Sequence, residues 1–174
     1  MLIRENNIFY LDTLIAQTKA PAKNILQSMQ AELFNSYLQN NRYKLYNRTA
    51  LAEEKSKDIR TWSFKKLQET TTALYEASLL PATILQQQPI EKWNPILITG
   101  SNTRKIRPTL FDLLANRALQ FYMSAENYTP EPTYKFVIND PQYLADVNTF
   151  IEIKIETKDT TSLQLKALKL YQNY

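Results

Sequence analysis

The sequence has no cysteine and no histidine, and it has a single glycine in 174 residues. Without cysteine and histidine the chain has no disulfide, no thiol nucleophile, no imidazole base, no Ser-His-Asp triad and none of the usual side-chain set for zinc. The scarcity of glycine leaves few positions for a positive φ, which disfavours tight primed hairpins and an all-β fold. These absences predict a mainly helical protein and exclude the commonest hydrolytic and metal-dependent mechanisms.

Charge and hydropathy narrow the range of partners. The chain carries 21 Lys and Arg against 17 Asp and Glu, a formal net charge of +4, and no block of five like charges occurs. The stretch RYKLYNR at 42–48 mixes tyrosine with cations, as a base-stacking platform would, but Glu53 and Glu54 follow closely. No apolar run reaches the roughly 18 residues of a membrane span. We therefore expect no nucleic-acid partner and no direct membrane insertion.

Apolar residues recur at helical spacing in five stretches. They predict helices over residues 4–19, 22–45, 63–80, 108–123 and 159–174, the third capped by Thr61 or Ser63 and the last by Asp159 or Thr160. The break at 19–21 is so short that the first two helices should form an antiparallel hairpin. Residues 42–58 and 124–133 are expected to be loops, and residues 81–99, which hold three prolines, allow at most a turn or two of helix.

Two stretches near the C-terminus alternate apolar and polar residues instead. YKFVIND at 134–140 and TFIEIKIET at 149–157 each have the period of a strand, which leaves room for a small two-stranded β element over 134–156. The predicted fold class is mainly α, with antiparallel helical hairpins packed around a central helix, 108–123. A single helical domain over 1–174 is expected. Because the last helix lacks a stop signal, that domain is interpreted as a fragment of a larger multidomain protein.

The sharpest local feature is the basic cluster of Arg104, Lys105 and Arg107, which lies just before Pro108. A helix N-terminus attracts anions, and arginine can hold a carboxylate or phosphate of a partner in a fork. The alternative is structural: the same cations pair with Asp112 or another carboxylate and hold the loop to the helices. The structural interpretation is preferred, because most charged clusters of this kind are structural or solvated.

The predicted central helix has one polar stripe, which includes Asp112, Asn116 and Arg117. These side chains either line a cleft or, as we favour, reach the surface and satisfy backbone groups. Trp93 is expected to anchor the proline-rich segment to the core. Glu152 and Glu156 have the spacing of a solvated strand face rather than of an acid–base pair. No cofactor and no metal ligand set is predicted.

Four stretches in order carry a family resemblance: AKNILQSMQAELFNSYLQNNRYKLYNRTA, DIRTWSFKKL, TTALYEASLL and SNTRKIRPTLFDLLANRALQFY. They resemble the N-terminal helical region of very large alpha-2-macroglobulin family proteins of the Bacteroidetes type, from about Ala22 to the segment LKALKLYQ. The resemblance implies an exported, signal-bearing protein several times longer than this chain, with macroglobulin β-sandwiches in its later domains. No signal pattern follows Met1, so under this interpretation a signal has been removed.

Members of that family that trap proteases use a bait segment and, in many cases, a Cys-Gly-Glu-Gln thioester. Since this chain has no cysteine, no trapping residue is carried over to it. The expectation is a non-catalytic helical structural or interaction module in the periplasm or cell envelope, whose partners are other domains of the same polypeptide and other proteins. Two alternatives stay open: a free-standing cytosolic adaptor, like a helical repeat, that binds peptides, and an enzyme that uses only Asp, Glu, Lys, Arg, Tyr and Ser.

Overall fold

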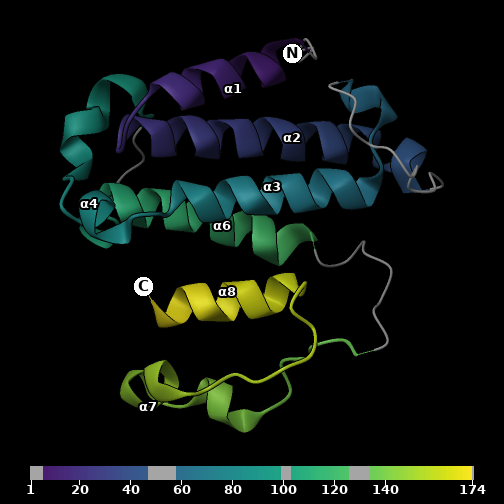
Figure 1. The fold of residues 1–174 in the computed structure, drawn as a ribbon. Helices are drawn as coiled ribbons and strands as arrows, with labels where there is room; N and C mark the ends of the chain where they lie inside the picture. Colours follow the sequence, from purple (N-terminus) through teal and green to yellow (C-terminus); the bar gives the residue numbers. More distant parts are fainter. Residues whose placement is uncertain (1–5, 47–57, 99–102, 126–133, 174) are drawn as a thin grey trace. The chain divides into compact units, whose positions relative to one another are not determined.

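The computed structural model describes residues 6–46, 58–98, 103–125 and 134–173 (Figure 1). The chain divides into two compact units, Met1–Arg117 and Ala118–Tyr174. The division falls inside one continuous helix, α6 (Leu110–Ala125), so the single domain expected over 1–174 stays a prediction.

The predicted mainly α fold class is confirmed. Before α6, unit 1 holds three long helices, which are α1 (Asn6–Gln17), α2 (Ala22–Tyr46) and α3 (Phe64–Ser78). Its short helices are η1 (Ile59–Thr61), α4 (Ala82–Gln86), η2 (Ile90–Ile96) and α5 (Thr103–Ile106). The proline-rich segment carries more helix than its prolines suggested, since α4 and η2 both begin directly after a proline, where the missing N–H has no cost. The loop expected at 42–58 is wrong for residues 42–46, which continue α2. Residues 47–57, like Gly100, lie outside the described residues.

Helix α2 packs along both α1 and α3 (Figure 1). The α1–α2 pair is the predicted antiparallel hairpin, and polar side chains of α2 fasten both of its neighbours. The Gln30 amide donates to the backbone oxygen of Ile8 at 3.0 Å and to Asp12 Oδ1 at 2.6 Å. The Asn24 amide donates to the backbone oxygens of Ser78 and Leu80, at 3.0 and 2.8 Å. Buried polar side chains at these positions therefore fix the relative placement of the three helices.

Aromatic rings form the centre of the unit 1 core. The rings of Phe34 and Trp62 are stacked, with centroids 5.4 Å apart and planes 10° apart, and Phe9 meets both rings edge-on. Ile8, Leu38 and other apolar side chains complete this cluster. Trp62 lies between η1 and α3, where Ser63 accepts a hydrogen bond from Lys66 N and caps α3, as the sequence predicted.

Helix α6 is apolar around most of its circumference and is buried accordingly, as expected for the predicted helix 108–123. The buried side chains are those of Leu110, Phe111, Leu114, Ala115, Ala118, Leu119, Phe121 and Tyr122. The predicted start at Pro108 is two residues early. Thr109 is the capping residue, and the backbone of Leu110 donates to the Gln88 oxygen at 2.9 Å.

Unit 2 contains, after the end of α6, the helices η4 (Pro141–Leu144), α7 (Val147–Glu152) and α8 (Leu163–Gln172). The two-stranded β element expected over 134–156 is wrong, since no strand occurs in the described part of that range. The reason is local capping. The Asp146 carboxylate accepts hydrogen bonds from Asn148 N, Thr149 N and Thr149 Oγ1, which starts a helix where the period of two predicted a strand. The bond from the Thr149 hydroxyl holds the pKa of Asp146 below its ordinary value.

Asp159 is the polar centre of unit 2. One carboxylate oxygen accepts the Phe136 N–H at 3.0 Å, and the other accepts the Thr161 N–H at 3.2 Å and its hydroxyl at 3.0 Å. Burial opposes ionisation of this carboxyl, but these hydrogen bonds outweigh it and hold its pKa below the ordinary value. Asp159 is thus engaged with Phe136, which packs on Leu165 and Leu168, and the cap of α8 falls instead to Ser162.

The Asp159→Asn variant tests this arrangement. An amide nitrogen would face one of the donors, so we expect the free energy of unfolding to fall by about 1–3 kcal/mol at neutral pH. Because the folded pKa of Asp159 is lowered, its contribution is complete above the unfolded pKa and is lost as the pH falls through the folded value. The difference in stability between wild type and variant should therefore shrink between pH 7 and about pH 3.

Thermal unfolding by circular dichroism, with amide exchange of α8 as the local readout, measures that difference. Glu156→Gln, at an exposed position nearby, is the matched control. A stability difference that stays constant with pH would show that the Asp159 carboxylate does not hold unit 2 together.

Candidate functional site

The predicted basic cluster lies in and just after α5. The Arg104 guanidinium donates to Asn94 Oδ1 at 2.6 Å, which ties α5 to η2. Lys105 is exposed and Arg107 is half-buried. Within the described residues, none of these three cations takes part in an ion pair. Two of the cations thus keep their charge available at the surface, while Arg104 has a structural bond as well.

The N-terminus of α6, which the basic cluster precedes, is already occupied by a carboxylate. Asp112 Oδ2 accepts the Thr109 N–H and the Thr109 hydroxyl, both at 2.8 Å. Thr109 Oγ1 in turn accepts the Asp112 N–H at 3.3 Å. This reciprocal pair is a capping box with aspartate in the third helical position. Asp112 therefore supplies the negative charge that an external anion would have brought to this helix end.

Arg117 lies five residues further along α6 and joins a different group of polar side chains. Its Nε donates to Ser28 Oγ at 2.8 Å, and its guanidinium lies 4.0 Å from Glu32 Oε2. The same Glu32 oxygen accepts the hydroxyl of Tyr75 at 2.9 Å, from a ring that is fully buried. Helices α2, α3 and α6 therefore share one polar junction, defined by Ser28, Glu32, Tyr75 and Arg117.

Sequence reasoning found Arg117 but missed the other three members of this junction. Ser28 and Glu32 are four residues apart on α2, which places them on one face. The sequence shows this spacing, but it does not show that Arg117 of α6 is the partner of both side chains. Asn116, the remaining predicted residue of the polar stripe, is half-buried. The seven predicted site residues therefore do not form one site: Arg117 belongs to the polar junction, Asn116 directly precedes it on α6, Asp112 lies in the first turn of α6, and the other four lie in η2 or in and just after α5.

Trp93 lies in η2 with its ring half-buried, and its indole nitrogen is buried without a hydrogen-bond acceptor among the described residues. The start of η2 is joined to the start of α6, because Ile90 N donates to the Pro108 oxygen at 2.9 Å. Trp93 thus belongs to the same part of unit 1 as the basic cluster. These backbone bonds join the segment to the start of α6, and the anchoring role expected of the Trp93 indole stays a prediction.

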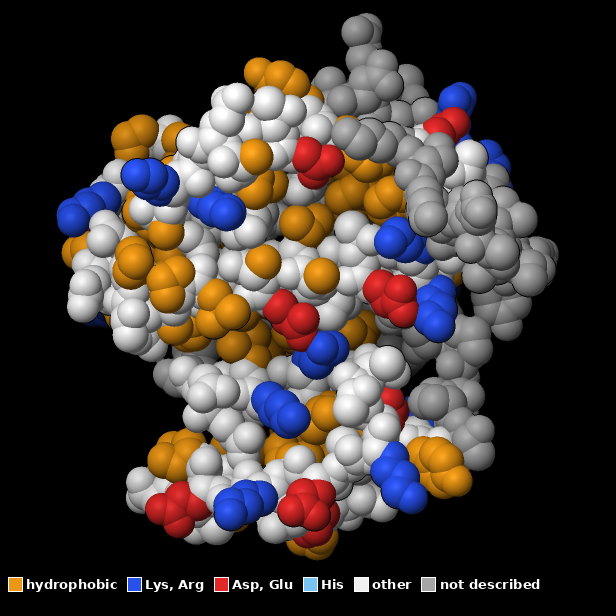
Figure 2. Space-filling view, in the orientation of Figure 1, with side chains coloured by type: hydrophobic (Ala, Val, Ile, Leu, Met, Phe, Trp, Pro, Cys, Tyr) orange, Lys and Arg blue, Asp and Glu red, His pale blue; other side chains and the backbone are white. Residues whose placement is uncertain are grey.

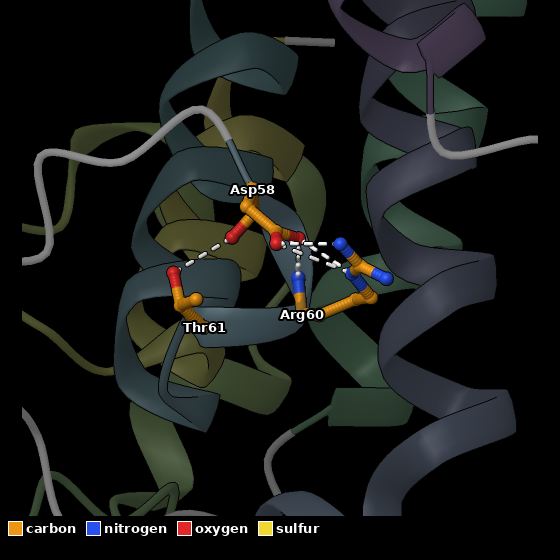
Figure 3. Close-up of polar contacts among 3 residues, drawn as sticks. All are labelled: Asp58, Arg60 and Thr61. Carbon is orange, nitrogen blue, oxygen red and sulfur yellow. Dashed lines mark hydrogen bonds and ion pairs between the residues drawn. The ribbon is translucent and has the colours of Figure 1, made fainter.

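A second charged feature, which the sequence did not single out, caps η1. Asp58 accepts the Arg60 N–H at 3.0 Å and also accepts from Nε and Nη2 of the same guanidinium, and Thr61 Oγ1 donates to the Asp58 backbone oxygen (Figure 3). The hydrogen bond from the Arg60 side chain holds the pKa of Asp58 below its ordinary value. The motif is local and presents Ile59 and Trp62 to the core.

Two further kinds of site do not occur in the described residues. Groups of acidic side chains with the arrangement of metal ligands are absent from this part of the chain. None of its helices has both the length and the apolar character needed to cross a membrane.

Three isoleucines in or next to η2 and α5 are exposed. Ile96, Ile98 and Ile106 are 61%, 105% and 71% exposed. Figure 2 shows apolar and cationic side chains without acidic ones among them at the left of the view, toward the end of unit 1 where α4 lies. Exposed aliphatic side chains beside unpaired cations are typical of a surface that binds another molecule.

Comparison with protein-family models, with curated proteins and with solved structures found no match for this chain.

Proposed function

We propose that this chain is a non-catalytic helical module of a large exported alpha-2-macroglobulin-like protein, where it serves as scaffold and interaction surface. The family part of the proposal rests on the four ordered stretches of sequence, from AKNILQSMQ to RPTLFDLLANRALQFY. The module part rests on the geometry of the charged side chains. Protease trapping, which is the family role, belongs in this proposal to other regions of the polypeptide.

One observation carries the module role: Arg117, a residue of the predicted site, is used to join helices. Arg117 and Glu32 connect α6, α2 and α3 through Ser28 and Tyr75, and Asp112 caps its own helix. A side chain that is held by two or three bonds of this kind is well placed to fix helix orientation. Such a chain presents a rigid surface to neighbouring domains, which suits a scaffold that precedes the working parts of a larger protein.

Deletion in the full-length gene product tests the proposal. Removing residues 1–174 is expected to lower the amount of exported protein or its capacity to trap a test protease, because later domains lose their supporting module. A version that keeps the residues but carries Lys169→Glu, an exposed change, is the control. If export, abundance and trapping are all unchanged by the deletion, the scaffold role is wrong. A gene product of 174 residues without a signal sequence would remove the macroglobulin assignment.

A further inference from the structure

We infer that the exposed part of η2 and α5 is a docking surface for an acidic, amphipathic segment of a protein partner. The η2–α5 surface is defined by Ile96, Ile98, Ile106, Lys92, Lys105 and Arg107. The inference deepens the proposed function and rests on it in one respect, namely that the chain is an interaction module. It adds the place of contact and the chemistry of the partner.

The η2–α5 surface combines exposed apolar side chains with positive charge. Three isoleucines on this surface are each more than half exposed, and an exposed isoleucine gains free energy when a partner removes it from water. Over residues 89–108 the cations are Lys92, Arg104, Lys105 and Arg107, and the only acid is Glu91, so the segment carries a charge of +3. An apolar surface with these cations beside it complements a partner whose apolar residues are flanked by Asp and Glu.

Hydrogen bonds hold the η2–α5 surface in place. Arg104 bonds to Asn94 at 2.6 Å, which couples α5 to η2. Antiparallel backbone bonds couple the start of η2 to the start of α6, through Ile90 N to the Pro108 oxygen and Leu110 N to the Gln88 oxygen. The capping box of Asp112 then fixes the end of α6 itself. A surface fixed before binding loses little conformational entropy when a partner docks.

The same features favour a protein partner over the other anionic macromolecules. Single-stranded nucleic acids are bound by aromatic platforms, whereas the exposed side chains here are aliphatic. Helices that lie on anionic membranes have long apolar faces, whereas η2 has seven residues and α5 has four. Short rigid elements with branched aliphatic side chains fit a protein groove or helix better than a lipid surface.

Two synthetic peptides provide the test. One is an 18-residue amphipathic helix with leucine on one face and glutamate on the other, and its counterpart has lysine in place of glutamate. Each is titrated into the whole 174-residue chain, with Trp93 fluorescence and calorimetry as readouts. We expect the glutamate peptide to bind at least tenfold more tightly than the lysine peptide, with an affinity that falls as salt is added.

Variants assign the binding to the surface. The double variant Lys105→Glu/Arg107→Glu is expected to weaken binding of the glutamate peptide by about tenfold, since each charge reversal replaces an attraction with a repulsion. Ile106→Ser should weaken it by about threefold through lost apolar burial. Lys169→Glu reverses an exposed charge in unit 2 and should leave the affinity unchanged. Circular dichroism confirms that each variant is folded, and because Ile106 is 71% exposed, its replacement keeps the test valid if the double variant does not fold.

Three results would overturn the inference. They are equal binding of both peptides, binding of neither, and weakening by Lys169→Glu as large as that by the double variant. Phosphatidylserine vesicles that sediment with the chain, in the absence of peptide binding, would assign the surface to lipid instead and would likewise overturn it. If the peptides do not bind as expected, the deletion experiment on the full-length gene product still tests the proposed function. If the deletion has no effect, a measured peptide affinity still supports the docking surface.

Discussion

Leu114→Asp is expected to prevent the chain from folding. Leu114 is 1% exposed on α6, next to Ala115 and one turn from Leu110 and Ala118, all of which are fully buried. A carboxylate at this position would be buried without a partner, at a cost of several kcal/mol. Since a domain of this size is stable by only about 5–15 kcal/mol, that cost removes most of its stability. Soluble expression and far-UV circular dichroism measure the outcome.

Two companions make the Leu114 result interpretable. Leu114→Ala should fold but lose about 2–5 kcal/mol in denaturant unfolding, because it removes buried methyl groups and leaves a cavity. Gln120→Asp places the same carboxylate at an exposed position of the same helix and should have little effect. A soluble Leu114→Asp protein with the unfolding midpoint of the wild type would show that the core along α6 is not where the structure places it.

Phe34→Ala is expected to be the most damaging truncation in unit 1. The Phe34 ring is 2% exposed and stacks on Trp62, with Phe9 against both rings. Removing a buried aromatic ring costs about 3–5 kcal/mol, through lost transfer free energy and the cavity that remains. Trp62 loses its stacking partner, so its fluorescence should shift toward that of a more hydrated indole in the native state.

The matched control for Phe34 is Tyr43→Ala on the same helix. Tyr43 is 88% exposed, and its ring is contacted by the Arg42 guanidinium at 5.7 Å from the centroid. Its removal should change the free energy of unfolding by about 1 kcal/mol or less. Chemical denaturation followed by tryptophan fluorescence compares the two variants. Equal losses for Phe34→Ala and Tyr43→Ala would contradict the aromatic core of unit 1.

The long helices could be predicted from the sequence because their signal is local and repeated. The apolar spacing recurs along most of the 25 residues of α2, and Ser63 has the residue type and position of a helix cap. The same kind of signal failed after Tyr134. There the alternation of apolar and polar residues is a few residues long, and a single capping carboxylate, Asp146, was enough to favour helix α7.

The candidate site was less predictable than the fold. Arg104, Lys105, Arg107 and Trp93 come from one short stretch of sequence, 93–107, and lie in one part of unit 1, because backbone hydrogen bonds hold η2 beside the start of α6. The role of Asp112 in the capping box has a three-residue spacing and was within reach of sequence reasoning. Because the sequence predicts a helix start at Pro108, it does not assign Asp112 to the capping box.

Composition and periodicity alone determined that this protein is mainly helical, that α2, α3 and α6 exist, and that cysteine and histidine chemistry is excluded. Only the tertiary structure decided which polar side chains meet. Tyr75 reaches Glu32 across 43 residues and Arg117 reaches Ser28 across 89. Hydrophobic periodicity states which face of a helix is buried, but not which helix covers it, so pairings of this kind arise only when the helices pack.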